Sequence, residues 1–312
     1  MLVIQHTEHF RIESPTIVTI GTFDGIHLGH QKILSRLNEL KKQTGLKTVV
    51  LTFDPHPRKV LFPEQKDLKL LTGIDEKLEL LKKYQVDVAV VYPFSKAFSQ
   101  LSSEVYITHI LKKSLHVKYL VIGYDHKFGL NRTGDIHTLR QYAADKSFEV
   151  EEISAKDIDS IAVSSSKIRK ALEEGDVELA AEFLGYPFFM EATVVKGKQL
   201  GRTLGYPTAN LMTHSTDKLI PARGVYFVGV NIGQTSYHGM MSIGLNPTTD
   251  HDLNTKLEVH VFDFNADLYD QNLRVEFLKY LRPEKKFESL EALKQALHED
   301  KEKCYELLTT HT

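Results

Sequence analysis

Short apolar and β-branched runs alternate with helical patterns through the first half of the chain. The runs lie at residues 16–20, 48–53, 86–91, 119–123 and 148–153. Between them, apolar residues recur at helical spacing over 33–40, 74–84, 104–115 and 136–144. Strands that alternate with helices predict an α/β domain in which a parallel sheet is covered on both faces.

The pattern changes at the turn signal Gly185-Tyr186-Pro187. Before it, helical patterns cover 164–170 and 177–184. After it, β-rich runs follow one another without helices, at 188–195, 225–232, 237–243, 257–264 and 273–278, and a helix over 290–297 continues as a helical tail to about 308. Such consecutive strands predict an antiparallel barrel or sandwich. We therefore predict two domains, residues 1–186 and 187–312.

The composition narrows the class of protein. The chain has 312 residues, 42% of them hydrophobic and 26% charged, with a net charge of −2. It carries no overall basic charge that would favour nucleic acid. A single cysteine fits a reducing compartment, and no run is long and apolar enough to span a membrane. We expect a cytoplasmic protein that acts on small molecules, without nucleic-acid or membrane partners; a homo-oligomer remains possible.

The stretch from Gly21 to His30 joins the first predicted strand to the first predicted helix. Its glycines leave room for a ligand near the backbone, and a helix start attracts phosphate. His27 and His30 lie three residues apart, so in a helical first turn their imidazoles would point to the same place. This arrangement suits charge that develops on a phosphoryl group, although two histidines at this spacing also occur by chance.

Three further polar segments are candidates for ligand binding. The segment 53–58 follows the second strand and is stiffened by Pro55 and Pro57. The segment 123–135 is too polar and rich in glycine to be core. The segment 164–169 places three serines at a helix start with an arginine beyond them, which suits a polyphosphate. Each segment taken alone also has a purely structural interpretation.

Together these four segments resemble one family. The bacterial bifunctional riboflavin kinase/FMN adenylyltransferases, also called FAD synthetases, carry four motifs in this order: GxFDGxHxGH, TFDPHP, a glycine-rich loop after VIG, and SSSxIR. The resemblance of this chain to that family extends from about residue 17 to residue 300. The resemblance implies a Rossmann-like nucleotidyltransferase domain, with His27 and His30 as catalytic residues. It implies ATP or phosphate contacts at Gly21, Phe23, Asp24, Gly29, Ser165 and Arg169. It implies flavin contacts at Asp54, His56, Pro57, Asp125, Phe128 and Asn131. His126-Lys127 departs from the family's usual Phe-Arg.

A second phosphate-binding segment lies in the predicted barrel. Residues 196–210 join three glycines and three cations to a Pro-Thr-Ala-Asn turn, and this is not a Walker loop. A threonine hydroxyl and an asparagine carbonyl could ligate Mg²⁺. The run resembles the phosphate loop of riboflavin kinases, which implies ATP contacts at Gly197, Gly201, Arg202, Gly205, Thr208 and Asn210. The last two would also be the metal ligands.

A carboxylate on a strand completes this half. Glu258 shares one face of its predicted strand with His260. The resemblance implies that Glu258 is the catalytic base and that Arg282 contacts flavin. Asn246 departs from the family's usual arginine.

We therefore expect a bifunctional flavin cofactor enzyme. The barrel would phosphorylate riboflavin to FMN with ATP and Mg²⁺, and the first domain would adenylylate FMN to FAD with release of pyrophosphate. Another nucleotidyltransferase of the HxGH class would leave the Pro-Thr-Ala-Asn barrel unexplained. A class I aminoacyl-tRNA synthetase would need a KMSKS-like motif, which the chain lacks. A non-catalytic flavin sensor would not need the full set of catalytic groups.

Overall fold

The structure is a computed structural model, and it describes residues 1–5, 7–64, 68–144, 147–154, 163–197, 201, 204–245 and 255–310. The chain forms two compact units, Met1–Ser165 and Ser166–Thr312.

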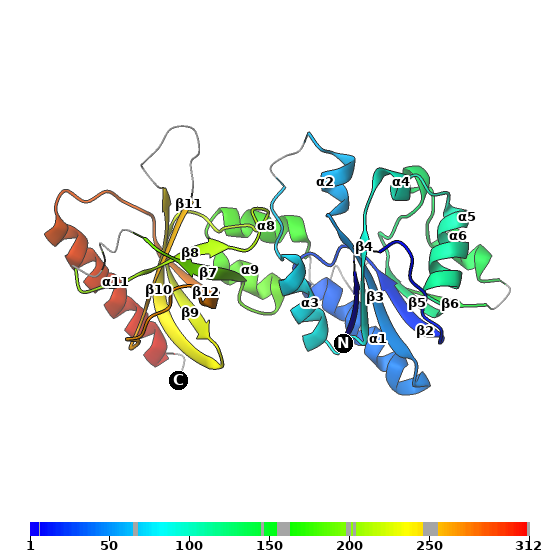
Figure 1. The fold of residues 1–312 in the computed structure, drawn as a ribbon, viewed down its shortest axis with the longest axis horizontal. Coiled ribbons are helices and arrows are strands. Elements are labelled where there is room, and N and C mark those ends of the chain that lie inside the picture. Colours follow the sequence, from blue (N-terminus) through cyan, green and yellow to red (C-terminus); the bar gives the residue numbers. More distant parts are fainter. Residues whose placement is uncertain are drawn as a thin grey trace. The chain divides into compact units, whose positions relative to one another are not determined.

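The first unit contains a six-stranded sheet in which every pairing is parallel, with the order β1-β4-β3-β2-β5-β6 (Figure 1). The strands are β1 (Leu2–Gln5), β2 (Thr16–Ile20), β3 (Lys47–Asp54), β4 (Val88–Pro93), β5 (Val117–Gly123) and β6 (Glu149–Ile153). The parallel sheet and the five predicted strands are confirmed. The four-residue edge strand β1 was not predicted, because its apolar run, Leu2 to Ile4, is short and its side chains are mostly exposed.

The connections between these strands are mostly helical. They are α1 (Leu28–Thr44), α2 (Pro57–Leu61), α3 (Ile74–Lys83), α4 (Lys96–Ser99), α5 (Ser103–Val105), the π-helix η1 (Tyr106–Ser114), the 3₁₀ turn η2 (Leu130–Arg132) and α6 (Ile136–Tyr142). The helix predicted over 104–115 is thus mostly π-helical, a form that is often associated with functional sites.

Helices cover both faces of the sheet. All five residues of the central strand β2 are buried. Val18 and Ile20 belong to a core cluster with Ile107 and Leu111 of η1, whereas α1 packs against β2, β3 and β5. Successive strand residues point to opposite faces, so a strand buried along its whole length needs cover on both.

The second unit is built around a closed antiparallel barrel with the order β10-β11-β8-β7-β12-β9 (Figure 1). Its strands are β7 (Phe189–Val195), β8 (Ala209–Thr213), β9 (Gly224–Ile232), β10 (Thr235–Leu245), β11 (Thr255–Val261) and β12 (Asn272–Arg282), and α11 (Leu290–Thr310) follows as one continuous helix. Of the two predicted alternatives, the barrel is confirmed. The missed strand β8 carries the Ala-Asn half of the Pro-Thr-Ala-Asn turn.

The helices α8 (Ser165–Glu173) and α9 (Val177–Leu184) fall almost entirely within the second unit. Ala222 N donates to Leu172 O at 2.9 Å, and Glu178 of α9 pairs with Lys279 of β12. The compact units therefore divide 21 residues before the domain boundary predicted at 186/187, because these helices pack on the barrel. Where the two activities divide stays a prediction. In the described part of the chain, no helix is both long and apolar enough to cross a membrane.

Candidate functional site

The histidine motif lies where β2 ends and α1 begins. His27 is the N-cap residue of α1 and is 7% exposed. The imidazoles of His27 and His30 stack with their centroids 3.8 Å apart and an angle of 18° between the rings. The convergence predicted from their spacing is therefore present in the fold, at the helix end where backbone N–H groups attract anions.

Contacts from two other segments hold this loop. The Asp24 carboxylate accepts from Thr72 N at 3.1 Å, and Gly25 N donates to Thr72 Oγ1 at 3.1 Å. Ser165 Oγ donates to Asp24 O at 3.0 Å, so the serine helix start reaches the loop. Phe23, with a left-handed φ of 48°, places its ring 4.9 Å from that of His30. Such backbone outliers cost about 1–3 kcal/mol and cluster at functional sites.

The surroundings keep His30 uncharged. Burial, then the nearby His27 and Lys77, lower the pKa of His30 well below its usual value. Its Nδ1 atom is buried and has no hydrogen-bond partner among the described residues. A neutral imidazole with an unused ring nitrogen at a helix start can bind a phosphoryl oxygen or its proton.

The two predicted flavin-contacting loops differ in how they are held. In the first, His56 caps the short helix α2, because its Nδ1 accepts from Arg58 N at 3.2 Å, and Pro57 occupies the first turn. His56 is therefore buried and structural in part, whereas Asp54 lies at the exposed end of β3.

In the second loop, Phe128 is buried and stacks on Tyr106 of η1, with centroids 4.9 Å apart. His126 stacks on Phe128 as well, with centroids 5.8 Å apart, and burial together with Arg132 lowers the pKa of His126 to about 4. Asp125 and Asn131 are exposed. Tyr106 was missed, because a tyrosine inside a helical pattern carries no signal of its own.

In the barrel, the strand pairing brings the predicted catalytic groups together. Glu258 of β11 lies opposite Asn210 of β8 in the antiparallel register. His260 Nδ1 donates to Pro207 O at 2.7 Å and so fixes the turn that carries Thr208. Burial lowers the pKa of His260, which suits this role as a neutral donor.

The phosphate loop packs against the same side chains. A Cβ atom at Gly201 would collide with Tyr206 O and lie 3.1 Å from Thr208 Oγ1, so this approach requires glycine. One at Gly197 would collide with the side chain of Asn210. Gly205 has a left-handed φ of 83°. The predicted contact Arg202 and the departure Asn246 lie outside the described residues.

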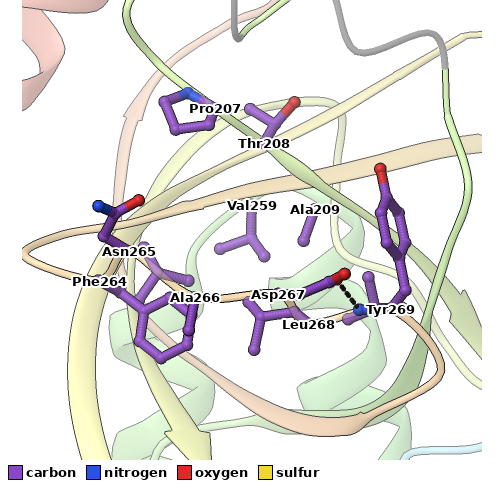
Figure 2. A pocket seen from close by; sticks show the side chains of 12 residues that line it. Pro207, Thr208, Ala209, Val259, Phe264, Asn265, Ala266, Asp267, Leu268 and Tyr269 are labelled. Carbon is purple, nitrogen blue, oxygen red and sulfur yellow. Dashed lines mark hydrogen bonds between the residues drawn. The ribbon is translucent and has the colours of Figure 1, made fainter.

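Thr208 lines two cavities of the barrel unit. The larger, of about 520 Å³, lies between the Pro207-Thr208-Ala209 turn and the segment from Phe264 to Tyr269 (Figure 2). In that segment Tyr269 N donates to the Asp267 carboxylate at 2.9 Å, which closes a turn. The smaller cavity, of about 250 Å³, also contains Glu258 and Arg282. The 264–269 segment was missed, because its residues match no phosphate or catalytic motif.

The predicted arginines Arg282 and Arg169 both belong to the second unit. Arg282 lines the smaller cavity, but its guanidinium makes hydrogen bonds of 2.7–3.1 Å to the buried carboxylate of Asp300 on α11. Arg282 therefore also anchors α11 to the barrel. Arg169 lies on α8, beyond the Ser165/Ser166 division between the units.

Comparisons with known proteins agree with this two-part organisation. The family model described as FAD synthetase matches residues 9–167, and the one described as riboflavin kinase matches residues 184–308. A bifunctional riboflavin kinase/FMN adenylyltransferase of Listeria monocytogenes is 38% identical over 92% of this chain and 90% of its own length. One of Bacillus subtilis is 33% identical over 96% of both chains.

A solved structure shares the fold over almost the whole chain. A crystal structure described as a macrolide-efflux protein from Streptococcus pneumoniae has a TM-score of 0.88 and 33% identity, and the match covers 96% of this chain and 97% of that one. Its description concerns efflux, but both family models and the curated relatives name flavin enzymes. Among the alternatives weighed from the sequence, the comparisons thus favour the two-activity enzyme: the chain belongs to the bifunctional riboflavin kinase/FMN adenylyltransferase family.

Proposed function

We propose that the barrel unit transfers the γ-phosphoryl group of ATP to the 5′-hydroxyl of riboflavin, with Thr208 at the junction of the two substrates. The observation that carries this proposal is that Thr208 lines both cavities. The larger cavity would take the nucleotide and the smaller one the flavin. The reacting phosphoryl would then lie between them, beside the glycines that approach Thr208 and Asn210.

Glu258 is the group best placed to accept the hydroxyl proton. It lies in the smaller cavity with Thr208 and opposite Asn210 in the strand register. Its carboxylate pairs with Lys256 at 2.8 Å and remains 24% exposed, so a substrate can reach it. Phosphoryl transfer depends chiefly on positioning and on neutralising charge.

Mg²⁺ is part of this proposal. In the described part of the chain, no cluster of three or more His, Cys, Asp or Glu side chains could hold a metal ion by itself. The oxygen donors of Thr208 and Asn210 beside the phosphate loop fit a hard cation that takes its other ligands from water and ATP phosphates. Bound there, it would neutralise the charge of the phosphates.

For the first unit, we propose adenylyl transfer at the histidine loop. An oxygen of the FMN phosphate attacks the α-phosphorus of ATP, and the bond to the pyrophosphate oxygen breaks. No protein nucleophile is needed, because the phosphate is one already. His27 and His30 would donate hydrogen bonds to the charge that develops, and Ser165 would hold the departing pyrophosphate. A pyrophosphate contact by Arg169 stays a prediction from the family resemblance.

The flavin would lie toward the two loops that the sequence predicts for it. The loop that carries Asp54, His56 and Pro57 follows β3, and the loop with Asp125, Phe128 and Asn131 follows β5. Ligands of parallel sheets bind beyond the carboxyl ends of the strands, where both loops lie. Exposed Asp125 and Asn131 can reach a ligand directly, whereas buried Phe128 would shape the site through Tyr106.

One assay tests the whole proposal. Purified protein is incubated with riboflavin, ATP and Mg²⁺, and the flavins are separated by chromatography. We expect FMN and then FAD to form, and EDTA to stop both steps. Formation of neither product would refute the proposed function. Cytoplasmic location and independence from nucleic acid and membranes remain part of the proposal.

A further inference from the structure

A buried lysine that no sequence motif pointed to lies beside the histidine loop. Lys77 is in the second turn of α3 and is only 5% exposed. The start of that helix is tied to the loop, because the preceding Thr72 bonds to Asp24 and Gly25. The lysine is thus held in a fixed relation to the proposed adenylyl-transfer site.

The ammonium of Lys77 is poorly neutralised by its neighbours. Its one hydrogen bond among the described residues goes to Thr52 Oγ1, at 3.4 Å, and no described carboxylate lies within 4.0 Å of it. Asp24 and Asp54 are near enough to favour its charged form, although burial outweighs them and lowers the pKa of Lys77. A buried charge without a close partner costs several kcal/mol, so such groups mark functional sites.

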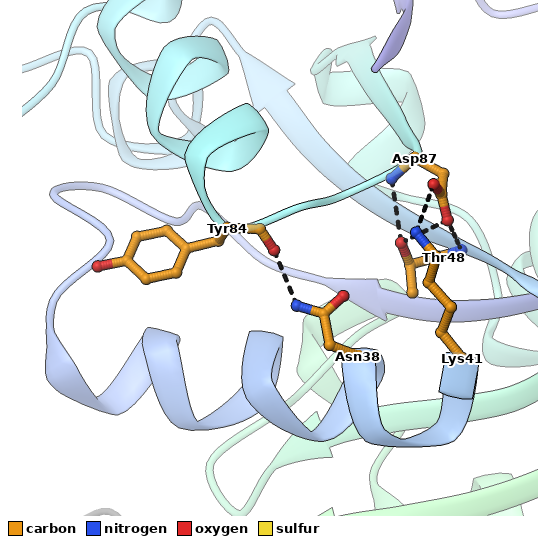
Figure 3. A network of polar contacts seen from close by, with 5 residues as sticks. All are labelled: Asn38, Lys41, Thr48, Tyr84 and Asp87. Carbon is orange, nitrogen blue, oxygen red and sulfur yellow. Dashed lines mark hydrogen bonds and ion pairs between the residues drawn. The ribbon is translucent and has the colours of Figure 1, made fainter. Parts of the chain in front are cut away.

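Lys41 of the same unit is a structural lysine with which Lys77 can be compared. Its Nζ atom lies 2.6 Å from the Asp87 carboxylate, which also accepts from Thr48 N and Thr48 Oγ1 (Figure 3). Lys41 is partly exposed and fully paired. Lys77 is more deeply buried and lacks such a pair, so fold stability alone does not explain its charge.

A short relay connects Lys77 to the loop. Thr52 Oγ1 donates to Thr22 O at 3.0 Å, which leaves the oxygen of this hydroxyl to accept from Lys77. Thr22 lies between Gly21 and Phe23 in the histidine motif. The lysine therefore touches the loop through one buried side chain, and its positive charge contributes to lowering the pKa of His30.

We propose that Lys77 is a positioning residue for adenylyl transfer: its ammonium holds the histidine loop through Thr52 and offsets the carboxylates of Asp24 and Asp54. The substrates of this step are two phosphate compounds. Without Lys77, α3 would supply no positive charge near the carboxylates of Asp24 and Asp54. These carboxylates would then repel the negatively charged phosphate substrates. The inference rests on the proposed placement of adenylyl transfer at His27 and His30.

The test uses the full chain and follows FAD formation from FMN and ATP. Lys77→Met keeps most of the length of the side chain and removes its charge, and Lys77→Arg restores the charge. Lys41→Met is the matched control, because it removes a lysine charge from the same unit. For Lys77→Met we expect kcat to fall by about 10- to 100-fold and KM to change by less than about threefold. The reason is that the variant lacks a preorganised positive charge that stabilises the transition state. Lys77→Arg should recover at least about tenfold of this loss, and Lys41→Met should stay within about twofold.

A pH profile separates positioning from a merely structural role. The charged or titratable groups identified around His30 and Lys77 are His27, Asp24 and Asp54. Loss of the positive charge raises the pKa of His30, so the acid limb of the Lys77→Met profile should move to higher pH. A rate within twofold of wild type, or a loss that arginine does not relieve and that leaves the profile unmoved, would overturn the proposal.

Two further variants keep the test decisive. If Lys77→Met does not fold, Thr52→Val removes the relay and keeps the lysine; the proposal then requires FAD formation to fall by about tenfold, and an unchanged rate refutes it. His30→Ala tests the placement of the site itself. If His30→Ala is inactive but Lys77→Met is normal, only the inference fails, whereas a normal His30→Ala shows that the placement is wrong.

Discussion

Replacement of Glu258 by glutamine tests the kinase half of the enzyme most directly. The change keeps the size of the side chain and removes its charge. The ion pair with Lys256, 2.8 Å long and partly exposed, is lost. Exposed pairs of this kind contribute only about 0–1 kcal/mol, so the barrel should remain folded.

The effect on chemistry should be much larger. A positioned general base contributes about 10²–10⁴-fold. By the relation of about 1.4 kcal/mol for each factor of ten, this equals about 3–5 kcal/mol of transition-state stabilisation. We therefore expect FMN formation from riboflavin to fall by this factor. FAD formation from supplied FMN should be unchanged, because the proposed adenylyl-transfer site lies in the other unit.

The barrel offers a matched control. Glu276 of β12 pairs with Arg274 two residues away at 3.1 Å and is 29% exposed, yet it lines neither cavity described above. Glu276→Gln thus makes the same chemical change to the same kind of ion pair. Both half-reactions are measured on each variant by chromatography of the flavins. If Glu258→Gln phosphorylates riboflavin as fast as Glu276→Gln does, Glu258 is not the base.

Four other outcomes are expected. His30→Ala should reduce FAD formation by about 10²–10³-fold and leave FMN formation intact, as measured on the same preparation. Asp87→Asn should destabilise the first unit by about 1 kcal/mol in urea unfolding. Burial alone would raise the pKa of Asp87, but its hydrogen bonds hold that pKa below the unfolded value. The stability difference from wild type should therefore be present above the unfolded pKa and vanish as the pH falls through the folded pKa. Asp300→Ala should cost up to about 3 kcal/mol, visible in thermal unfolding, because it leaves a guanidinium without its partner. A fragment 166–312 should fold and make FMN, whereas 187–312 should melt at a lower temperature because it lacks α8 and α9; equal melting temperatures would contradict the packing argument.

Local patterns were sufficient for most elements of the fold. Continuous apolar runs marked the buried strands such as β2, because a strand covered on both faces needs apolar residues at every position. Two strands with little burial were missed: the short apolar run of β1 is mostly exposed, and β8 has one fully buried residue. The π-helical form of η1 was also invisible, since its spacing of apolar residues resembles that of an α-helix.

Groups that lie close together along the chain could be assigned to a common site before the fold was known. His27 and His30 converge because a helical turn separates them, and Thr208 and Asn210 share one turn, so their chemistry could be inferred from spacing alone. The family resemblance rested on the same short motifs, and the comparisons confirmed the family.

The tertiary structure alone decided which distant segments share a site. Strand pairing placed Glu258 opposite Asn210, and the fold set the 264–269 segment beside Thr208 to form the larger cavity. It also paired Arg282 with Asp300 and buried Lys77 beside the histidine loop. None of these contacts follows from local spacing, because each joins segments whose meeting depends on sheet order, barrel closure and the packing of helices against them.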